Sequence, residues 1–133
     1  MEHSRRLADH LPHCRLADHL PRERFIALLK RLVIERGCIV GNSSAGLIEA
    51  AALALPAVNL GPRQAGRERH TTVLDITNPD PAKVREAIDN ARKNAPWPPS
   101  TAFGDGHASS AIARTLASIE LHDPALLRKR AAD

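Results

Sequence analysis

The sequence predicts an α/β protein in which a parallel sheet is flanked by helices. Short apolar runs, typical of buried strands, alternate along the chain with segments whose apolar residues recur every three or four positions. A turn of small residues, 41–46, joins the first strand-like run to the next helix-like segment. The chain has 133 residues, 43% of them hydrophobic but few of them aromatic, which suits one domain with an aliphatic core. Strands alternating with helices imply right-handed crossovers and therefore a parallel sheet.

The first predicted helix spans residues 23–36, because its apolar side chains form one stripe at helical spacing. The members of that stripe are Phe25, Leu28, Leu29, Leu32 and Val33. Gly37 is expected to end this helix. A short buried strand at 38–40 follows.

A second helix is predicted over residues 47–55, ended by Pro56. Two further apolar runs predict strands at 57–60 and 73–76, and a polar loop rich in arginine, 61–71, separates them.

Asp80 and Pro81 predict the start of another helix, with Asp80 as its N-cap. The expected buried face of this helix is Val84, Ala87, Ile88 and Ala91. The proline-rich run 96–99 breaks the chain, and a last helix is predicted over 107–121.

Three regions are expected along the chain. Residues 1–21 hold a direct repeat, in which the sequence of 6–12 recurs at 15–21 as a duplicated leader. Residues 22–121 form the α/β domain, and 122–133 form a basic tail that frays. His10, His13 and Cys14 resemble metal ligands, but no second cluster completes a four-ligand site, so no metal is predicted.

Composition limits the classes of partner. The net charge is +4 and the pI about 9.7, but the arginines are scattered and no aromatic residues lie between them to stack on bases. A small anion such as a nucleotide diphosphate explains the charge equally well, the alternative is that excess arginine only keeps the domain soluble, and no nucleic acid is expected. No apolar run is long enough to span a membrane. Two cysteines make no disulfide framework, which predicts a reducing cytoplasm.

The turn at 41–46 is the predicted phosphate site. Backbone N–H groups at a helix start lack partners there, and small hydroxyl residues let an anion approach. Ser43, Ser44 and Gly46 are the expected contacts, and Glu49 lies one helical turn further, within reach of sugar hydroxyls. The alternative is that both serines only cap the helix. The loop at 61–69 also leaves the carboxyl end of a strand, so both loops are expected to converge on one cleft.

These motifs resemble those of UDP-N-acetylglucosamine 2-epimerases. The resemblance rests on Gly-Asn-Ser-Ser-Ala-Gly-Leu-Ile-Glu at 41–49, on the Pro-Ala-Val-Asn-Leu-Gly-Pro-Arg-Gln-Ala-Gly-Arg-Glu run at 56–68, and on Phe-Gly-Asp-Gly-His-Ala-Ser at 103–109. It covers roughly residues 20–119 and is closest to the hydrolysing branch, which converts UDP-GlcNAc to UDP and N-acetylmannosamine. It implies two Rossmann-like domains of glycosyltransferase-B type, of which this chain is part of the C-terminal one.

Carried over by position, the resemblance implies a UDP site. Ser43 and Ser44 would contact the diphosphate, Glu49 the ribose, and Arg63 the phosphate oxygens. Gln64 and Arg67 lie in the same loop, where a role in binding is weighed equally against a solvated loop. In the alternative arrangement, the loop arginines, including Arg69, pair with Glu68. Asp105 and His107 are expected to cap the last helix rather than to act as an acid–base pair.

The resemblance also marks what this chain lacks. The family's proton-moving carboxylates and an upstream histidine belong to segments before the start of this sequence, as do the opening strands of the C-terminal domain. The chain is therefore expected to bind UDP or a UDP-N-acetyl sugar without turnover, with no metal or organic cofactor. It would act with a missing N-terminal domain or as a homodimer. The alternative is a non-catalytic remnant that binds nucleotide weakly or self-associates. The family's usual glycine near the second helix end is replaced by Ala54 and Leu55.

Overall fold

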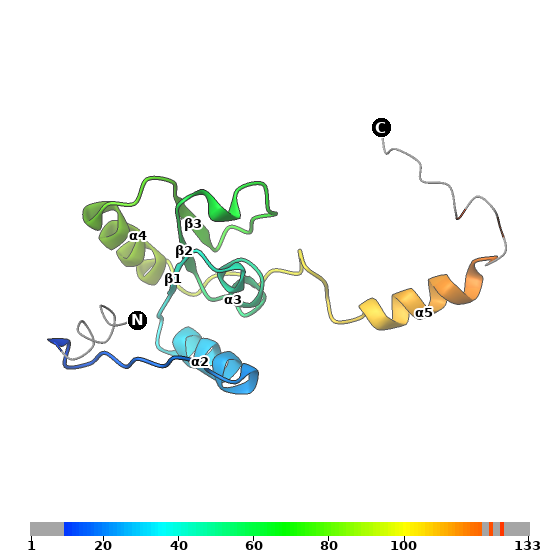
Figure 1. Ribbon diagram of the computed structural model, residues 1–133, viewed down its shortest axis with the longest axis horizontal. Coiled ribbons are helices and arrows are strands. Elements are labelled where there is room, and N and C mark those ends of the chain that lie inside the picture. Colours follow the sequence, from blue (N-terminus) through cyan, green and yellow to red (C-terminus); the bar gives the residue numbers. More distant parts are fainter. Residues whose placement is uncertain (1–9, 121–122, 124–125, 127–133) are drawn as a thin grey trace. The chain divides into compact units, whose positions relative to one another are not determined.

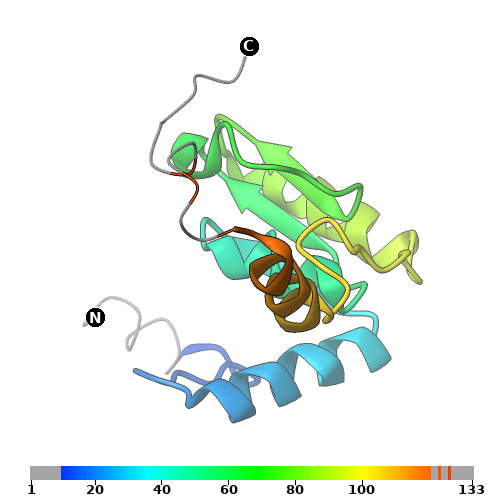
Figure 2. The ribbon, with the colours of Figure 1, turned by 90° about the vertical axis from the view of Figure 1, so that its right-hand side faces the viewer.

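The computed structural model describes residues 10–120, 123 and 126. A three-stranded parallel sheet forms its centre, with β1 (Ile39–Gly41), β2 (Ala57–Leu60) and β3 (Val73–Ile76) in the order β1-β2-β3. Figure 2 shows the arrows of β2 and β3 pointing the same way. The predicted α/β class and parallel sheet are confirmed, and the last two strands have the predicted bounds.

The register of the sheet aligns the ends of all three strands. Gly41 pairs with Asn59, and Asn59 pairs with Asp75. The loops that follow β1 and β2 therefore leave from the same edge of the sheet. The same register brings Asn59 and Asp75, which are 16 positions apart in the sequence, directly beside each other.

Helix α2 (Arg22–Ile34) matches the first predicted helix, but its C-terminal cap differs from the predicted one. Arg36, not Gly37, takes the left-handed conformation, with φ 53°. The N–H groups of Arg36 and Gly37 bond the carbonyls of Val33 and Leu32 at 3.2 and 2.7 Å, the pattern of a Schellman cap. Gly37 serves packing instead, because a Cβ there would lie 2.8 Å from Leu32 Cδ2.

The prediction of one helix over 47–55 is wrong. The chain forms a 3₁₀ turn, η1 (Ser44–Gly46), and then only four α-helical residues, α3 (Glu49–Ala52). The end is again a Schellman cap, because the N–H of Leu55 bonds Ala50 O at 2.8 Å and Ala54 has φ 59°. So short a helix depends on tertiary packing.

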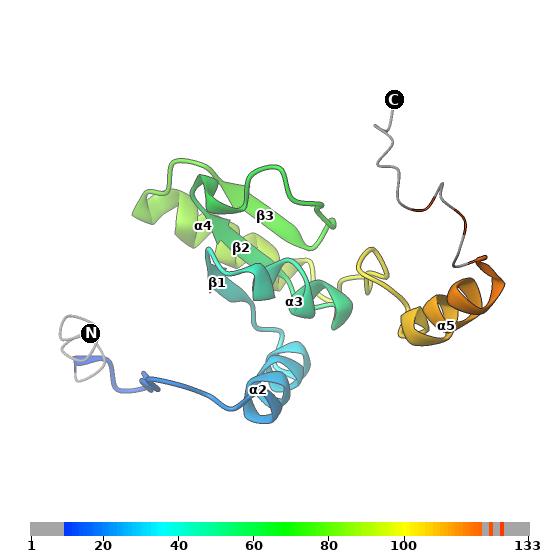
Figure 3. The ribbon, with the colours of Figure 1, turned by 45° about the vertical axis from the view of Figure 1, so that its right-hand side comes forward.

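Helix α4 (Pro81–Lys93) begins as the sequence predicts. Asp80 Oδ1 accepts hydrogen bonds from the N–H groups of Ala82 and Lys83, each at 3.0 Å. The bond from the Lys83 N–H is the main reason why the pKa of Asp80 lies below its ordinary value. The helix packs on β2 and β3 (Figures 1 and 3). Its predicted inner face is confirmed: Ala91 is buried and the other three members are half-buried.

The aliphatic core lies between α2, α3 and β1. Its centre is Leu29, Ala50 and Leu55, each at most 1% exposed. Partly buried side chains surround it: Phe25, Ile26, Leu32, Ile39 and Leu53. This core fixes the turn after β1, because α3 continues directly from that turn.

The chain divides into two compact units at Ser100. In the second, α5 (Ala108–Ser118) is shorter than the predicted helix, whose last residue, 121, lies outside the described residues. His107 stands at the N-cap position of α5 and makes no side-chain cap hydrogen bond. Its N–H donates to Asp105 Oδ1 at 2.9 Å, so Asp105 binds the residue before the helix, and the expected capping of the first turn by these two side chains is not seen among the described residues.

The predicted leader and tail are only partly described. Residues 1–9 of the leader and most of 122–133 lie outside the described residues, and the three-region division stays a prediction. Within the leader, the N–H of Cys14 bonds Leu11 O at 2.9 Å in a turn. None of the helices that the structure describes is long and apolar enough to cross a membrane.

Candidate functional site

The turn after β1 is shaped mainly by its own backbone. Ser43 Oγ accepts from the N–H of Ala45 at 3.3 Å, and the N–H of Gly46 bonds Ser43 O at 3.1 Å. Ser43 therefore caps the 3₁₀ turn, which agrees for this one serine with the alternative that both serines act as caps. Among the residues that the structure describes, no group accepts a hydrogen bond from the backbone N–H of Ser43 or of Ser44. Neighbouring N–H groups without partners are what an anion needs.

The helix dipole contributes less here than the sequence predicts. Because α3 has only four residues, it has little macrodipole to offer to a phosphate. Any anion affinity of the turn must come from its N–H and hydroxyl groups and from neighbouring cations. The correction concerns the length of the second helix, and the docking of a diphosphate at this turn stays a prediction.

The loop after β2 meets that turn, as predicted. Two side chains of the loop donate to one carbonyl, Asn42 O: Arg63 Nη1 at 3.0 Å and Gln64 Nε2 at 2.6 Å. Gln64 is 2% exposed, whereas Arg63 lies at the surface. A guanidinium carries five N–H groups, so Arg63 keeps further donors for an anion beside the turn.

Each loop has its own hollow. A small one of about 50 Å³ lies beside β1, lined by Ile39, Val40, Gly41, Ser43 and Gly46. A larger one of about 330 Å³ follows β2, lined by Gly61, Pro62, Ala65, Gly66, Arg69, Asp75 and Thr77. The loops thus meet through hydrogen bonds, but these two hollows share no lining residue, so neither of them is the single cleft that the sequence predicts between the loops.

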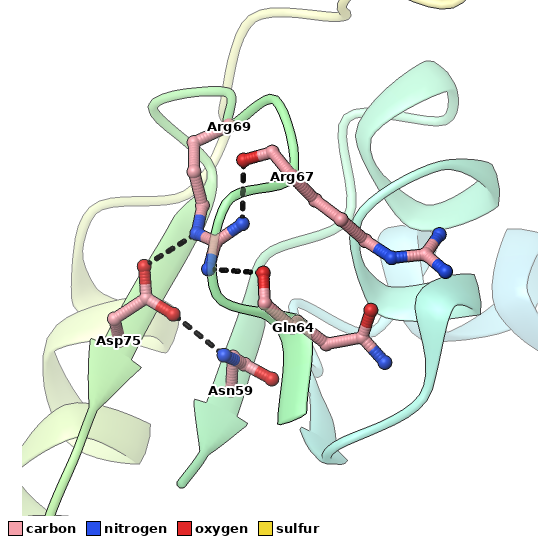
Figure 4. A network of polar contacts seen from close by, with 5 residues as sticks. All are labelled: Asn59, Gln64, Arg67, Arg69 and Asp75. Carbon is pink, nitrogen blue, oxygen red and sulfur yellow. Dashed lines mark hydrogen bonds and ion pairs between the residues drawn. The ribbon is translucent and has the colours of Figure 1, made fainter. Parts of the chain in front are cut away.

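A polar network fixes the second loop (Figure 4). Arg69 donates from Nε to Asp75 Oδ2 at 2.8 Å, from Nη1 to Arg67 O at 2.7 Å and from Nη2 to Gln64 O at 2.7 Å. Asn59 Nδ2 donates to the other carboxylate oxygen of Asp75 at 2.6 Å. The alternative pairing of Arg69 with Glu68 is wrong, because Arg69 binds Asp75.

Two buried amide oxygens in this region lack a described donor. They are Asn59 Oδ1 and Gln64 Oε1, on side chains that are each 2% exposed. A buried acceptor without a donor costs free energy, so these oxygens mark the places where water or a ligand N–H or O–H would be most favourable.

The remaining predicted site residues differ in setting. Glu49 is half-buried and lies 3.8 Å from Arg22 Nη1. Arg67 contributes its carbonyl to the network, and Figure 4 shows its guanidinium pointing away from Arg69 and Asp75. Gly46 is buried, and a Cβ there would lie 3.2 Å from Ala57 Cβ, so glycine allows the turn to approach β2. These placements leave the predicted binding roles as predictions.

A family assignment agrees with this geometry. The family model for UDP-N-acetylglucosamine 2-epimerase matches residues 2–117. The chain belongs to the UDP-N-acetylglucosamine 2-epimerase family. The match begins upstream of residue 20, where the motif resemblance starts, and so includes the duplicated leader.

Two curated proteins are similar to parts of the chain, and the name of the first describes a hydrolysing epimerase. It is 37% identical over 91 residues to the hydrolysing UDP-N,N'-diacetylbacillosamine 2-epimerase of Legionella pneumophila subsp. pneumophila (strain Philadelphia 1), covering 66% of this chain and 23% of that protein. It is 43% identical over 54 residues to polysialic acid biosynthesis protein P7 of Escherichia coli, covering 40% of this chain and 14% of that protein. The chain therefore matches less than a quarter of the length of either relative.

Sequence reasoning missed three residues of the network: Asn59, Arg69 and Asp75. Asn59 and Asp75 are polar residues inside strand-like runs, and Arg69 lies in the polar loop between those runs, which is the only local sign of their roles. Their contacts depend on the strand register, which places Asn59 opposite Asp75 and which the sequence alone does not specify.

Proposed function

We propose that this chain is the UDP-holding part of a hydrolysing UDP-N-acetylglucosamine 2-epimerase. The observation that carries the proposal is the meeting of the two loops at Asn42. There, Arg63 donates to the carbonyl of the peptide unit that precedes Ser43, and no acceptor in the described part of the chain binds the N–H of Ser43 or Ser44. Such an arrangement offers a diphosphate both a cation and backbone donors.

The proposed roles follow from the chemistry of each group. Ser43 and Ser44 donate to the diphosphate oxygens, and Arg63 neutralises part of their charge. The carboxylate of Glu49 accepts from ribose hydroxyls, because acceptors of that kind suit a diol. Gln64 and Arg67 complete the loop side of the site, and Gly46 keeps the turn close to β2.

In the proposed reaction this part of the enzyme stabilises the leaving group. Loss of the sugar C2 proton and departure of UDP place negative charge on the diphosphate, and donors already in position favour that charge. Proton transfer would be supplied by an N-terminal domain or by another chain that carries the acid–base groups. The proposed substrate is a UDP-N-acetyl sugar. The proposed location is the reducing cytoplasm, which is compatible with the two free cysteines, Cys14 and Cys38.

Binding and turnover measured together test the proposal. We expect saturable calorimetric binding of UDP by the isolated chain and no release of UDP from UDP-GlcNAc, because positioning without proton transfer does not complete the reaction. Ser44→Ala should weaken UDP binding by about tenfold while leaving the circular dichroism spectrum unchanged. Normal turnover by the isolated chain would contradict the division of labour. An absence of UDP binding would contradict the site and favour a non-catalytic remnant.

A further inference from the structure

Arg69 is the most fully engaged arginine side chain among the described residues of the second loop. Its guanidinium donates to two backbone carbonyls within the loop, Gln64 O and Arg67 O, and to the Asp75 carboxylate on β3. It is only 28% exposed. Arg69 therefore cannot turn to a ligand without giving up three hydrogen bonds.

These bonds connect the loop to the sheet at a fixed point. Asp75 is itself held from the other side by Asn59 Nδ2 at 2.6 Å, and both Asp75 and Asn59 belong to strands. A carboxylate held in this way is a rigid anchor for the Arg69 fork. The positions of the Gln64 and Arg67 carbonyls are then fixed by hydrogen bonds that lead to the sheet, and not by the conformation of the loop alone.

The anchored loop segment contains the residues that reach Asn42. Gln64 is held at its carbonyl by Arg69 and donates through its side chain to Asn42 O. Arg63, the preceding residue, donates to the same carbonyl. A path of hydrogen bonds thus runs from the Asp75 carboxylate through Arg69 and Gln64 to the turn after β1.

We propose that Arg69 is a positioning residue for the candidate UDP site. By clamping the loop carbonyls onto Asp75, it holds Arg63 and Gln64 in the geometry that presents the Arg63 guanidinium to a diphosphate. The proposal rests on the proposed function for its ligand, whereas the clamp itself is a property of the free chain. The role requires the planar guanidinium fork, because an ammonium group is a single point donor and cannot span three acceptors in fixed directions.

The experiment compares Arg69→Lys and Arg69→Ala with Arg85→Ala, an exposed α4 residue that serves as the matched loss of charge. The first readout needs no ligand: the carbonyl carbon shift of Asn42 and the Arg63 Nε resonance in the free chain. The second is the dissociation constant for UDP of the wild type, each single variant, Arg63→Ala, and the Arg63→Ala/Arg69→Lys double variant.

We expect both Arg69 variants to move the Asn42 and Arg63 resonances, and Arg85→Ala to leave them in place. We expect Arg69→Lys to weaken UDP binding by about tenfold despite its retained charge, and to have no further effect once Arg63 is alanine. If Arg69 had a purely structural role, the losses of UDP affinity in Arg63→Ala and Arg69→Lys would instead add up in the double variant. Normal UDP affinity of Arg69→Lys would overturn the proposal. Unmoved resonances in Arg69→Lys would overturn it even if Arg69→Ala fails to fold. An absence of UDP binding by the wild type, with the resonances shifted as expected, would refute the proposed function but not the clamp.

Discussion

The loops after β1 and β2 leave the same edge of the sheet but are held by different means. The turn after β1 is shaped by short-range backbone hydrogen bonds and one weak serine cap. The loop after β2 is shaped by side chains that reach neighbouring strands, with Arg69 and Asp75 at the centre. In the described part of the chain, the first loop thus leaves the N–H groups of Ser43 and Ser44 without an acceptor, while the second loop uses Arg69 for structure and leaves Arg63 at the surface.

This difference shows how similar residues in one loop divide their roles. Arg63 and Arg69 are six positions apart and carry the same charge, but only Arg69 binds a carboxylate in the structure. A count of arginines in the loop would therefore overestimate the cations available to an anion. The comparison also predicts that side-chain substitutions destabilise the second loop more than the first.

The largest effect is expected from Gln64→Glu. It replaces the buried Nε2 donor by an oxygen facing Asn42 O and places a carboxylate where the side chain is 2% exposed. We expect the free energy of unfolding, measured with urea, to fall by about 3 kcal/mol. Gln64→Met is the control, since it removes the donor without adding a charge. Equal stability of Gln64→Glu and the wild type would show that Gln64 is not enclosed.

The next effect is expected from Asp75→Ala, which removes the anchor of Arg69 and leaves Asn59 Nδ2 buried without a partner. We expect a loss of about 2 kcal/mol in urea unfolding, because a buried donor is left unsatisfied. In the double variant Asn59→Ala/Asp75→Ala, the loss in unfolding free energy should be smaller than the sum of the two single losses, because the two residues interact directly. Fully additive losses would argue against the contact.

The smallest effect is expected in the first loop, from Ser43→Ala. Its cap bond is long, at 3.3 Å, and exposed, so we expect a loss of only about 0.5 kcal/mol in thermal or urea unfolding. Ser109→Ala, which changes a serine inside α5, shows how much a Ser→Ala substitution alters the free energy of unfolding outside the loop. A loss as large as that of Asp75→Ala would remove the distinction between the two loops.

The sequence predicts the parts of the fold that depend on local patterns. The β2 and β3 strands follow from short apolar runs, the inner face of α4 from helical spacing, and the start of α4 from the capping residue Asp80. The short α3 could not be predicted, because its alanine-rich segment favours a helix locally and the left-handed turn falls on Ala54 rather than on glycine. At the site, the motifs indicated both loops, but the Asn59–Asp75–Arg69 network depends on strand register and was not predictable from spacing.

The most direct test of the central claim is a calorimetric titration of the chain with UDP, with Arg63→Ala and Arg85→Ala as a matched pair of charge losses. We expect saturable one-to-one binding by the wild type and by Arg85→Ala, and at least about tenfold weaker binding by Arg63→Ala. Equally weakened UDP binding in Arg63→Ala and Arg85→Ala would show that the effect comes from net charge alone. No saturable heat from the wild type would contradict the claim that the two loops form a UDP site.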